Sequence, residues 1–280
     1  MLTDAHCHPS DLSSFFHEFE DDRRKLGVIA AASACLKNEY AQYEILSRNA
    51  VLNNAAPLLI CFGIHPQIFK IKNEERTTIY NEQLTESYEN YNFYELLETL
   101  ELLTSKKSIC AVGECGFDLF NSVFKETEEL QERFFLQQIE IAIRYELPMV
   151  LHVRRAMHKI FAVSNLLSKC KSIVFHSWPG AFEEAQSLLR KGVNAYFSFG
   201  STILLNHKQA MRSCALLSSD RLLTETDAPY QPRRGQSFSQ WSDLPLILEA
   251  ASALRVEAGN KISVNDLENQ IEINFRKVFL

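Results

Sequence analysis

The segments Pro148-Met149-Val150-Leu151-His152 and Ser172-Ile173-Val174-Phe175-His176 decide the fold. Each is a short apolar run rich in Val, Ile, Leu or Phe, which is typical of a strand buried on both faces of a parallel sheet. Six further runs of this kind recur along the chain: Met1–Cys7, Gly27–Ser33, Pro57–Ile64, Ser108–Gly113, Val193–Phe199 and Leu222–Glu225. The sequence therefore predicts eight buried strands.

The segments between these strands carry helical patterns. Apolar residues recur at roughly helical spacing in four of them: Glu126–Tyr145, Ser164–Leu167, Phe182–Leu189 and Leu244–Leu254. Strands that alternate with helices predict an α/β fold in which a parallel sheet closes as a TIM-type (β/α)₈ barrel. Such a barrel takes about 250 residues, so we expect residues 1–280 to form one domain, with the polar stretch Gln67–Asn92 as its main insertion.

The composition is that of a globular protein. Hydrophobic residues make up 46% of the chain and charged residues 23%, which excludes wholesale disorder, a collagen-like sequence and a coiled-coil rod. The net charge of −6 argues against non-specific binding of nucleic acid by bulk charge. The apolar stretch Val28–Leu36 is too short to cross a bilayer, so we expect no membrane contact.

The ends of the chain and its cysteines bear on the compartment. The first residues are acidic and His residues rather than a basic and then apolar run, so we expect no signal peptide. The seven cysteines are scattered without a CxxC pair, which is typical of free thiols in a reducing compartment. We therefore expect a cytoplasmic protein.

The first strand ends in the sequence Asp4-Ala5-His6-Cys7-His8. Side chains alternate between the faces of a strand, so His6 and His8 project to the same side. A single His here would be a satisfied core residue more often than a ligand. Two imidazoles one residue apart at a strand end favour a divalent cation site.

Other strand ends carry the same chemistry. The fourth, fifth and sixth strands lead to Glu114, His152 and His176, and Asp227 follows the eighth. In a parallel barrel all these ends lie at one face, where barrel enzymes place their sites. The sequence therefore predicts that His6, His8, Glu114, His152, His176 and Asp227 converge on metal. Six ligands are more than one zinc-like ion takes from a protein, which favours two divalent ions, with one Glu114 oxygen on each.

Several motifs, taken together, resemble the TatD-type metal-dependent deoxyribonucleases, a branch of the amidohydrolase superfamily. The resemblance runs the length of the chain, in Asp4–His8, Cys61–Pro66, Val112–Asp118, Leu147–His152, Val174–His176, Glu225–Tyr230 and Asn274–Phe279. The last of these resembles the closing helix of the family. Many amidohydrolases carry a carbamylated Lys on the fourth strand, and Glu114 in its place is what makes the chain similar to the TatD branch.

The resemblance implies roles for the matched residues. His6, His8 and Asp227 are implied ligands of one metal, His152 and His176 of the other, and Glu114 bridges them. His65 resembles the third-strand His that lies beside the scissile phosphate. Two motifs depart from the family pattern: Val153-Arg154-Arg155 stands where Ser-Arg-Asp is usual, and His176-Ser177-Trp178-Pro179-Gly180 where His-Cys-Phe-Ser-Gly is usual.

The chemistry that follows is hydrolysis by a metal-bound hydroxide, with Mg, Mn or Zn as candidate ions. Asp227 and Glu114 are the expected catalytic residues, and Asp227 would take the proton of the attacking water. His65 and Arg154 are the expected substrate-binding residues. Arg154 can offer bidentate donors to a phosphate, or be a solvated Arg at a helix start. His65 can instead be a structural His in a turn fixed by Pro66.

Further polar and aromatic residues are candidates for the site or for a structural role. Glu225 either orients a ligand or is a paired acid inside the barrel, and Asp118 is expected to brace the loop after Glu114. Trp178 either stacks on a nucleobase or packs under a loop. Arg233-Arg234 can follow a DNA backbone, whereas Arg23-Arg24-Lys25 are expected on a solvated face at the opposite end.

The leading functional hypothesis is a nuclease that cleaves DNA phosphodiester bonds, with a 3′→5′ exonuclease as the family's variant. A second is hydrolysis of another bond, such as a D-aminoacyl-tRNA ester or a small amide, since the same hydroxide attacks a carbonyl carbon. A third is a non-catalytic metal-binding scaffold, against which the full ligand set argues. We expect DNA as the substrate and no obligate protein partner.

Overall fold

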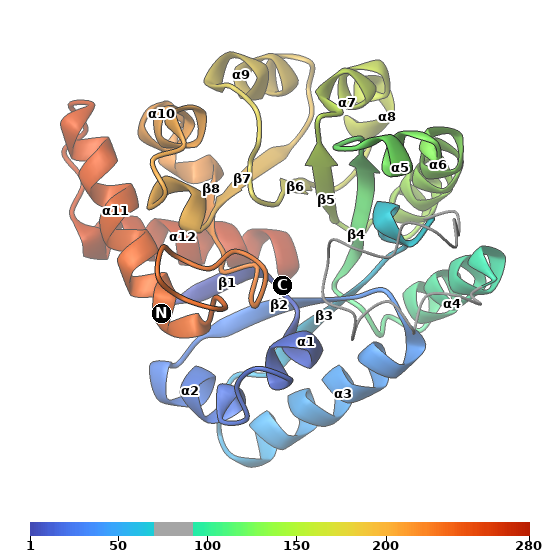
Figure 1. Cartoon of the computed structure of the whole chain (residues 1–280), viewed down its shortest axis with the longest axis horizontal. Helices are drawn as coiled ribbons and strands as arrows, with labels where there is room; N and C mark the ends of the chain where they lie inside the picture. The colour runs from blue at the N-terminus through green and yellow to red at the C-terminus, as the bar shows by residue number, and fades with distance from the viewer. Residues whose placement is uncertain (70–91) are drawn as a thin grey trace.

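The computed structural model describes residues 1–69 and 92–280, and these form a barrel of eight parallel strands surrounded by helices (Figure 1). The strands pair in chain order, from β1 to β8. Their bounds are Thr3–Cys7, Ile29–Ala34, Leu58–Phe62, Ala111–Asp118, Met149–Arg154, Ile173–Phe175, Ala195–Phe199 and Leu222–Thr224. Each strand overlaps one of the eight predicted runs, so the predicted (β/α)₈ barrel is confirmed.

The first and last strands lie side by side and complete the barrel. The Asp227 N–H donates to the His6 carbonyl over 3.0 Å, and the His8 N–H donates to the Ala228 carbonyl over 2.8 Å. At the other end of the same seam, the Thr224 hydroxyl donates to the Thr3 carbonyl. These bonds join the two edges of the sheet along the length of β1.

Helices follow the strands around the outside of the barrel (Figure 1). The α-helices α1 to α12 span Pro9–Ser13, Phe19–Leu26, Lys37–Leu52, Phe93–Ser105, Ser122–Lys125, Glu128–Arg144, Met157–Ala162, Ser164–Leu167, Phe182–Arg190, Lys208–Leu216, Leu244–Glu257 and Val264–Phe279. The 3-10 helices η1 to η4 span Pro66–Phe69, Ser201–Ile203, Ser219–Arg221 and Trp241–Asp243. The four predicted helices are confirmed as α6, α8, α9 and α11.

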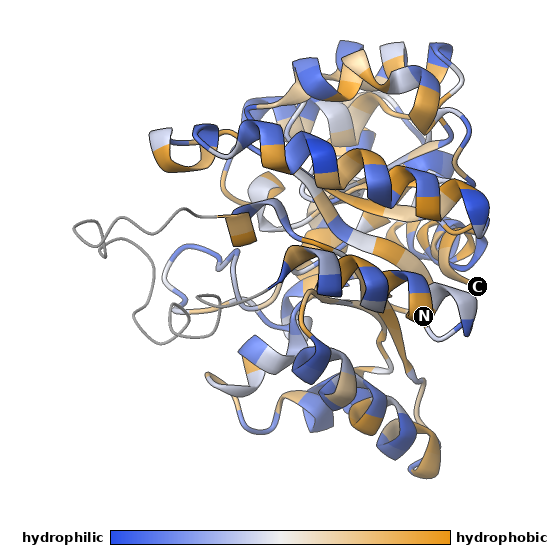
Figure 2. Ribbon diagram, turned by 90° about the vertical axis from the view of Figure 1, so that its right-hand side faces the viewer, coloured by the Kyte–Doolittle hydropathy of each residue, from blue (hydrophilic) through white to orange (hydrophobic). Residues whose placement is uncertain are grey.

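Two hydrophobic clusters hold the fold together. The larger cluster packs the outer faces of the strands against the helices, whose apolar stripes alternate with polar ones (Figure 2). The smaller one fills the barrel with residues from successive strands, among them Ala31, Val150 and Val174. This smaller cluster also includes Phe275, Val278 and Phe279 of α12. The C-terminal helix therefore closes the end of the barrel where the strands begin, opposite their carboxyl ends.

Two of the sequence expectations concern segments rather than sites. The expected insertion Gln67–Asn92 lies mostly outside the described residues, which resume at Asn92. Among the described helices, none combines the length and the apolar composition that a membrane crossing requires.

The expectation that Arg23 lies on a solvated face is wrong. Its side chain is fully buried, with 0% of the residue exposed. The guanidinium donates to the carbonyls of Val28 (2.9 Å) and Ala56 (3.0 Å), and it pairs with Glu20 at 2.6 Å. Arg23 therefore supplies donors to two carbonyls beside the amino-terminal ends of β2 and β3, a tertiary role that its polar neighbourhood in the sequence hides.

We expect Arg23→Ala to lower the free energy of unfolding by about 3 kcal/mol, because it leaves buried carbonyls and a carboxylate without a partner. Arg24→Ala is the matched control: among the described residues Arg24 pairs with the exposed Asp21 alone, and its loss should cost less than about 0.5 kcal/mol. Denaturant unfolding of both variants measures the difference, and equal costs would show that the burial of Arg23 contributes nothing specific.

Candidate metal centre

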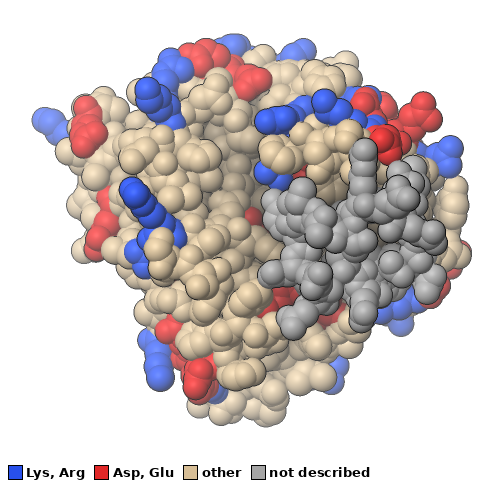
Figure 3. Space-filling model, in the orientation of Figure 1, with Lys and Arg blue, Asp and Glu red and all other residues tan. Residues whose placement is uncertain are grey.

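The six predicted metal ligands lie together at the carboxyl ends of the strands. His6 is in β1 and His8 directly follows it, Glu114 is in β4, His152 is in β5, His176 directly follows β6, and Asp227 follows β8. The barrel thus gathers residues that are far apart in the sequence at one end of the sheet. Figure 3 shows a hollow in the middle of this face, with acidic atoms visible inside it.

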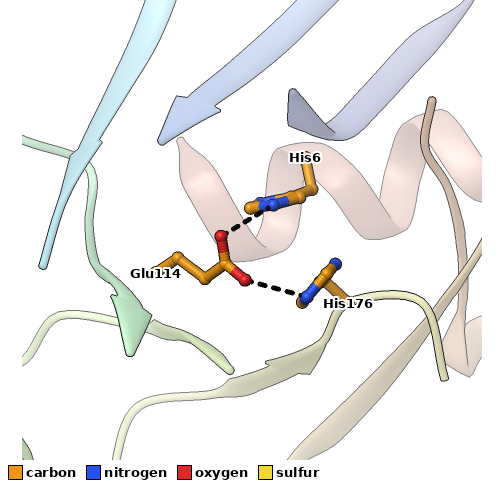
Figure 4. A group of neighbouring side chains, drawn as sticks. All are labelled: His6, Glu114 and His176. Atoms are coloured by element: carbon orange, nitrogen blue, oxygen red, sulfur yellow. Dashed lines mark ion pairs between the residues drawn. The ribbon is translucent and has the colours of Figure 1, made fainter. Parts of the chain in front are cut away.

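Glu114 lies at the centre of the group (Figure 4). Its Oε2 atom is 3.1 Å from His6 Nε2 and 3.5 Å from His8 Nε2. Its Oε1 atom is 2.8 Å from His152 Nδ1 and 2.9 Å from His176 Nε2. The two oxygens of one carboxylate therefore face two separate pairs of imidazoles.

Two further residues complete these groups. Asp227 Oδ1 lies 3.5 Å from His6 Nε2 and 3.6 Å from His8 Nε2, on the side of Glu114 Oε2. On the other side, His65 Nε2 lies 3.2 Å from Glu114 Oε1. His65, expected to contact substrate, is thus also close enough to Glu114 and His152 to be a ligand candidate.

The donor set fits a divalent metal. Ring nitrogens of different histidines approach one another, at 3.1 Å for His6 and His8 and at 3.1 Å for His152 and His176. Nitrogens and carboxylate oxygens that converge in this way are the ligands that Zn²⁺ and Mn²⁺ take in proteins. Three groups of three side chains have ligand atoms within 4.8 Å of one another: His6–Glu114–His176, His6–His8–Asp227 and His65–Glu114–His152.

Burial divides the centre into an inner wall and an outer rim. The side chains of His6, Glu114 and His176 are 0%, 4% and 6% exposed. Those of His8, His65 and His152 are 17%, 19% and 14% exposed. The side of the centre formed by His8, His65 and His152 is therefore the more exposed one.

Both carboxylates of the centre are held ionised. Burial alone would raise the pKa of Glu114, but the imidazoles of His65, His6 and His176 hold it well below its usual range. Burial likewise opposes ionisation of Asp227, and the nearby imidazoles of His8, His176 and His6 lower its pKa nevertheless. The carboxylates are thus ready to bind a cation without first losing a proton.

The pKa values of the imidazoles shift in different directions, depending on what surrounds each ring. Burial dominates at His6 and lowers its pKa against the opposing charge of Glu114. Burial also acts on His8 and His176, but Asp227 and Glu114 at His8, and Glu114 at His176, raise both pKa values well above the ordinary one. A metal must therefore displace protons from His8 and His176, and its affinity will fall as the pH falls.

On the ring nitrogen that faces away from Glu114, two of the histidines have a hydrogen-bonding partner and a third has a carboxylate nearby. Ser33 Oγ lies 3.1 Å from His6 Nδ1, and Asp118 Oδ2 lies 3.2 Å from His152 Nε2. Glu225 Oε1 lies 3.7 Å from His176 Nδ1 and accepts the Ser177 N–H over 2.5 Å. Partners of this kind fix the orientation of a ligand ring.

Two of these partners, Asp118 and Ser33, were not predicted from the sequence to contact a histidine. Asp118 was expected to brace a loop, and it does so by accepting the Phe120 N–H over 2.9 Å, but it also contacts His152. Burial opposes its ionisation, and the bond to His152 lowers its pKa to about 2. The signal was present, because β4 alternates and so places Asp118 on the same face as Glu114. No pattern pointed to Ser33.

Asp227 is held by a residue that the sequence analysis did not consider. Gln231 Nε2 donates to Asp227 Oδ2 over 2.8 Å and to Ser177 Oγ over 2.7 Å. Asp4 is buried below the candidate ligands. Its carboxylate accepts hydrogen bonds from the N–H groups of His6 and Thr226 and from the Thr226 hydroxyl. Asp4 thus ties β1 to the segment that carries Asp227.

The remaining candidates separate clearly. Trp178 is buried and donates its indole N–H to Ser213 Oγ over 3.2 Å, so it packs and offers no face to a base. Arg233 pairs with Asp243 at 2.6 Å, while Arg234 is exposed. Arg154 is the last residue of β5 and not the start of a helix, as one interpretation had it, and its guanidinium lies 3.7 Å from the centre of the Phe120 ring.

Comparison with known proteins decides the family. The family model described as "TatD related DNase" matches residues 3–280. This chain belongs to the TatD family.

Similar proteins agree with the family. A metal-dependent hydrolase of Buchnera aphidicola, described as uncharacterized, is 27% identical over 296 residues, covering 100% of this chain and 99% of its own. A protein of Pantoea ananatis named "3′-5′ ssDNA/RNA exonuclease TatD" is 31% identical over 193 residues, covering 66% of this chain and 71% of its own. The crystal structure of a TatD homologue from Escherichia coli superposes with a TM-score of 0.78 at 22% identity, covering 99% and 97% of the two chains. The family and the barrel are thereby established, and the TatD family is one of metal-dependent hydrolases.

We expect Asp118→Asn to weaken the binding of Mn²⁺ by about 10–100-fold, because it loosens the orientation of His152 while keeping the side chain's shape. Asp220→Asn is the matched control, since Asp220 is exposed and, within residues 1–69 and 92–280, pairs with Arg221 alone. Isothermal titration calorimetry with Mn²⁺ measures both. An affinity equal to that of the unaltered protein would show that Asp118 does not position the ligand.

Proposed function

We propose that this protein binds two divalent cations and cleaves phosphodiester bonds of DNA, removing nucleotides from the 3′ end. The observation that carries the proposal is the position of Glu114, whose two oxygens face two separate imidazole pairs. That arrangement suits a carboxylate shared between two ions, and two-metal sites are typical of nucleases.

Each ion has its own set of side chains in this proposal. His6, His8 and Asp227 would hold one ion with Glu114 Oε2, and His152 and His176 would hold the other with Glu114 Oε1. When bound, such ions lower the pKa of water and neutralise charge on phosphate oxygens. Imidazole with carboxylate suits Zn or Mn, and Mg remains a candidate through the carboxylates.

Asp227 is the proposed proton acceptor. Its Oδ2 atom is occupied by the Gln231 amide, which leaves Oδ1 directed toward His6 and His8 and available to the attacking water. Its lowered pKa keeps Asp227 ionised, and a positioned general base of this kind contributes about 10²–10⁴-fold to a rate. Glu114 fixes the distance between the two halves of the site.

His65 and Arg154 are the proposed contacts to the phosphate. His65 lies on the more exposed rim, with its Nε2 directed at Glu114 Oε1. Arg154 shares the inward face of β5 with His152, because side chains two residues apart lie on the same face of a strand. Guanidinium N–H groups at this position are suited to a phosphate oxygen.

The nature of the substrate is the finer part of the proposal. The name of the Pantoea relative supports a single-stranded nucleic acid substrate. The free thiols of Cys7, Cys61 and Cys115 support a cytoplasmic location, and we propose one domain over residues 1–280 with no obligate partner. Hydrolysis of a D-aminoacyl-tRNA ester or a small amide uses the same side chains, so the assay below includes an ester.

The test is digestion of a 5′-labelled single-stranded oligonucleotide with Mg²⁺ or Mn²⁺. We expect a ladder that shortens from the 3′ end, no activity in EDTA, and a loss of about 10²-fold or more in Asp227→Asn and Glu114→Gln. Glu140→Gln, on the exposed side of α6, is the matched control and should retain full activity.

Two outcomes would contradict the proposal. Undiminished cleavage by Asp227→Asn, or cleavage that persists in EDTA, would remove the catalytic assignment. Hydrolysis of an aminoacyl ester by a preparation that leaves the oligonucleotide intact would instead show that the bond is an ester of the second kind.

A further inference from the structure

The loops that follow β4 and β5 are joined at the edge of the metal centre. The Leu119 N–H donates to the Arg154 carbonyl over 2.9 Å, and Arg155 Nη1 donates to the Phe120 carbonyl over 3.1 Å. The same two strands carry Glu114 and His152. The joined loops therefore form a rigid rim directly beside the ligands.

Two guanidinium groups lie over one aromatic ring at this rim. The Cζ atom of Arg154 is 3.7 Å from the centre of the Phe120 ring, and that of Arg155 is 4.5 Å from it. Phe120 is 37% exposed, so the group lies at the surface. Contact of a guanidinium with a ring holds the side chain in place, while N–H donors in the guanidinium plane stay available to a ligand.

These two guanidinium groups have no counter-ion in the part of the chain that the structure describes. Several other arginines of the protein are paired, for example Arg144 with Glu101 and Arg212 with Glu183. Arg154 and Arg155 form no ion pair among residues 1–69 and 92–280. In a chain with net charge −6, two adjacent unpaired cations fixed at the edge of a site favour an anion from outside.

The position of the pair suggests which anion. Arg154 is two residues beyond His152 on the same strand face, about 7 Å further along β5 at about 3.3 Å per residue. Arg155 follows with a φ of 54°, which turns the chain, and its side chain is exposed. Arg154 thus lies next to His152 along the strand face, and Arg155 lies one residue further from the metal ligands.

We propose that Phe120, Arg154 and Arg155 form a subsite for the phosphate next to the one that is cleaved, with Arg154 reaching toward the scissile phosphate and Arg155 holding its neighbour. The preferred substrate is then a strand with at least two consecutive phosphates. This inference rests on the proposed function for its catalytic consequence. Arg155 stands where the family pattern has an aspartate. An arginine at this position offers donors to a phosphate, whereas an aspartate would repel it.

The experiment compares a dinucleoside monophosphate, d(TpT), with a trinucleoside diphosphate, d(TpTpT), as substrates with Mn²⁺. We expect the unaltered protein to prefer d(TpTpT), and Arg155→Gln to reduce the ratio of the two kcat/KM values by about tenfold, as expected for loss of a charge-assisted hydrogen bond. The matched control is Arg190→Gln, at an exposed Arg at the end of α9 that forms no ion pair with any described residue, and it should leave the ratio unchanged.

A binding measurement separates this inference from the proposed function. Fluorescence anisotropy of labelled (dT)₈ with the full chain in EDTA gives the affinity without cleavage. We expect Arg155→Gln to bind more weakly and to show a log K against log salt slope that is shallower by about 0.7, the value for one phosphate contact on a single strand.

The outcomes are distinct. Weaker binding and a shallower slope in a protein that cleaves no phosphodiester would support the subsite and overturn the nuclease proposal. Binding and slope equal to those of the unaltered protein, or an unchanged kcat/KM ratio, would overturn the subsite even if DNA is cleaved.

Discussion

The organisation of this protein depends on one buried carboxylate. Glu114 sits among imidazoles at the mouth of the barrel, with His6 and His8 on one oxygen and His152 and His176 on the other. A carboxylate in such a position is stable only when positive charge surrounds it. Burial opposes protonation of His8 and His176, but Glu114 and the neighbouring carboxylates raise both pKa values well above the ordinary one, so positive charge is favoured on the rings around Glu114.

The barrel produces this arrangement because each candidate ligand comes from the carboxyl end of a strand and all these ends meet at one face. Glu114 comes from β4 at a point where the register against β5 shifts between Val112 and Cys115. Gly116 follows in the same strand with a φ of 134°, and a Cβ there would lie 2.2 Å from the His152 carbonyl oxygen. Only glycine lets β4 approach β5 this closely, so the spacing between Glu114 and His152 is built into the backbone.

The residues that contact the far sides of the histidine rings come from other strands than the histidines themselves. Ser33 comes from β2, Asp118 from β4 and Glu225 from the residue after β8, so each partner reaches its histidine from another strand. Sequence alone predicted the eight strands and the convergence of six candidate ligands, because alternation and strand ends are local patterns. The partners of the histidine rings depend on which residues face each other across neighbouring strands. No single segment of the sequence shows that register, so these partners were not predicted. Arg23 was misjudged for a related reason: it lies in a polar run, and the carbonyls it satisfies come from Val28 and, far along the chain, Ala56.

The central claim is that two cations share Glu114. Anomalous diffraction from a crystal soaked in manganese tests it directly. We expect two peaks about 3.5–4 Å apart, one beside His6, His8 and Asp227 and one beside His152 and His176, with Glu114 between them. A single peak, or peaks that lie away from Glu114, would contradict the account.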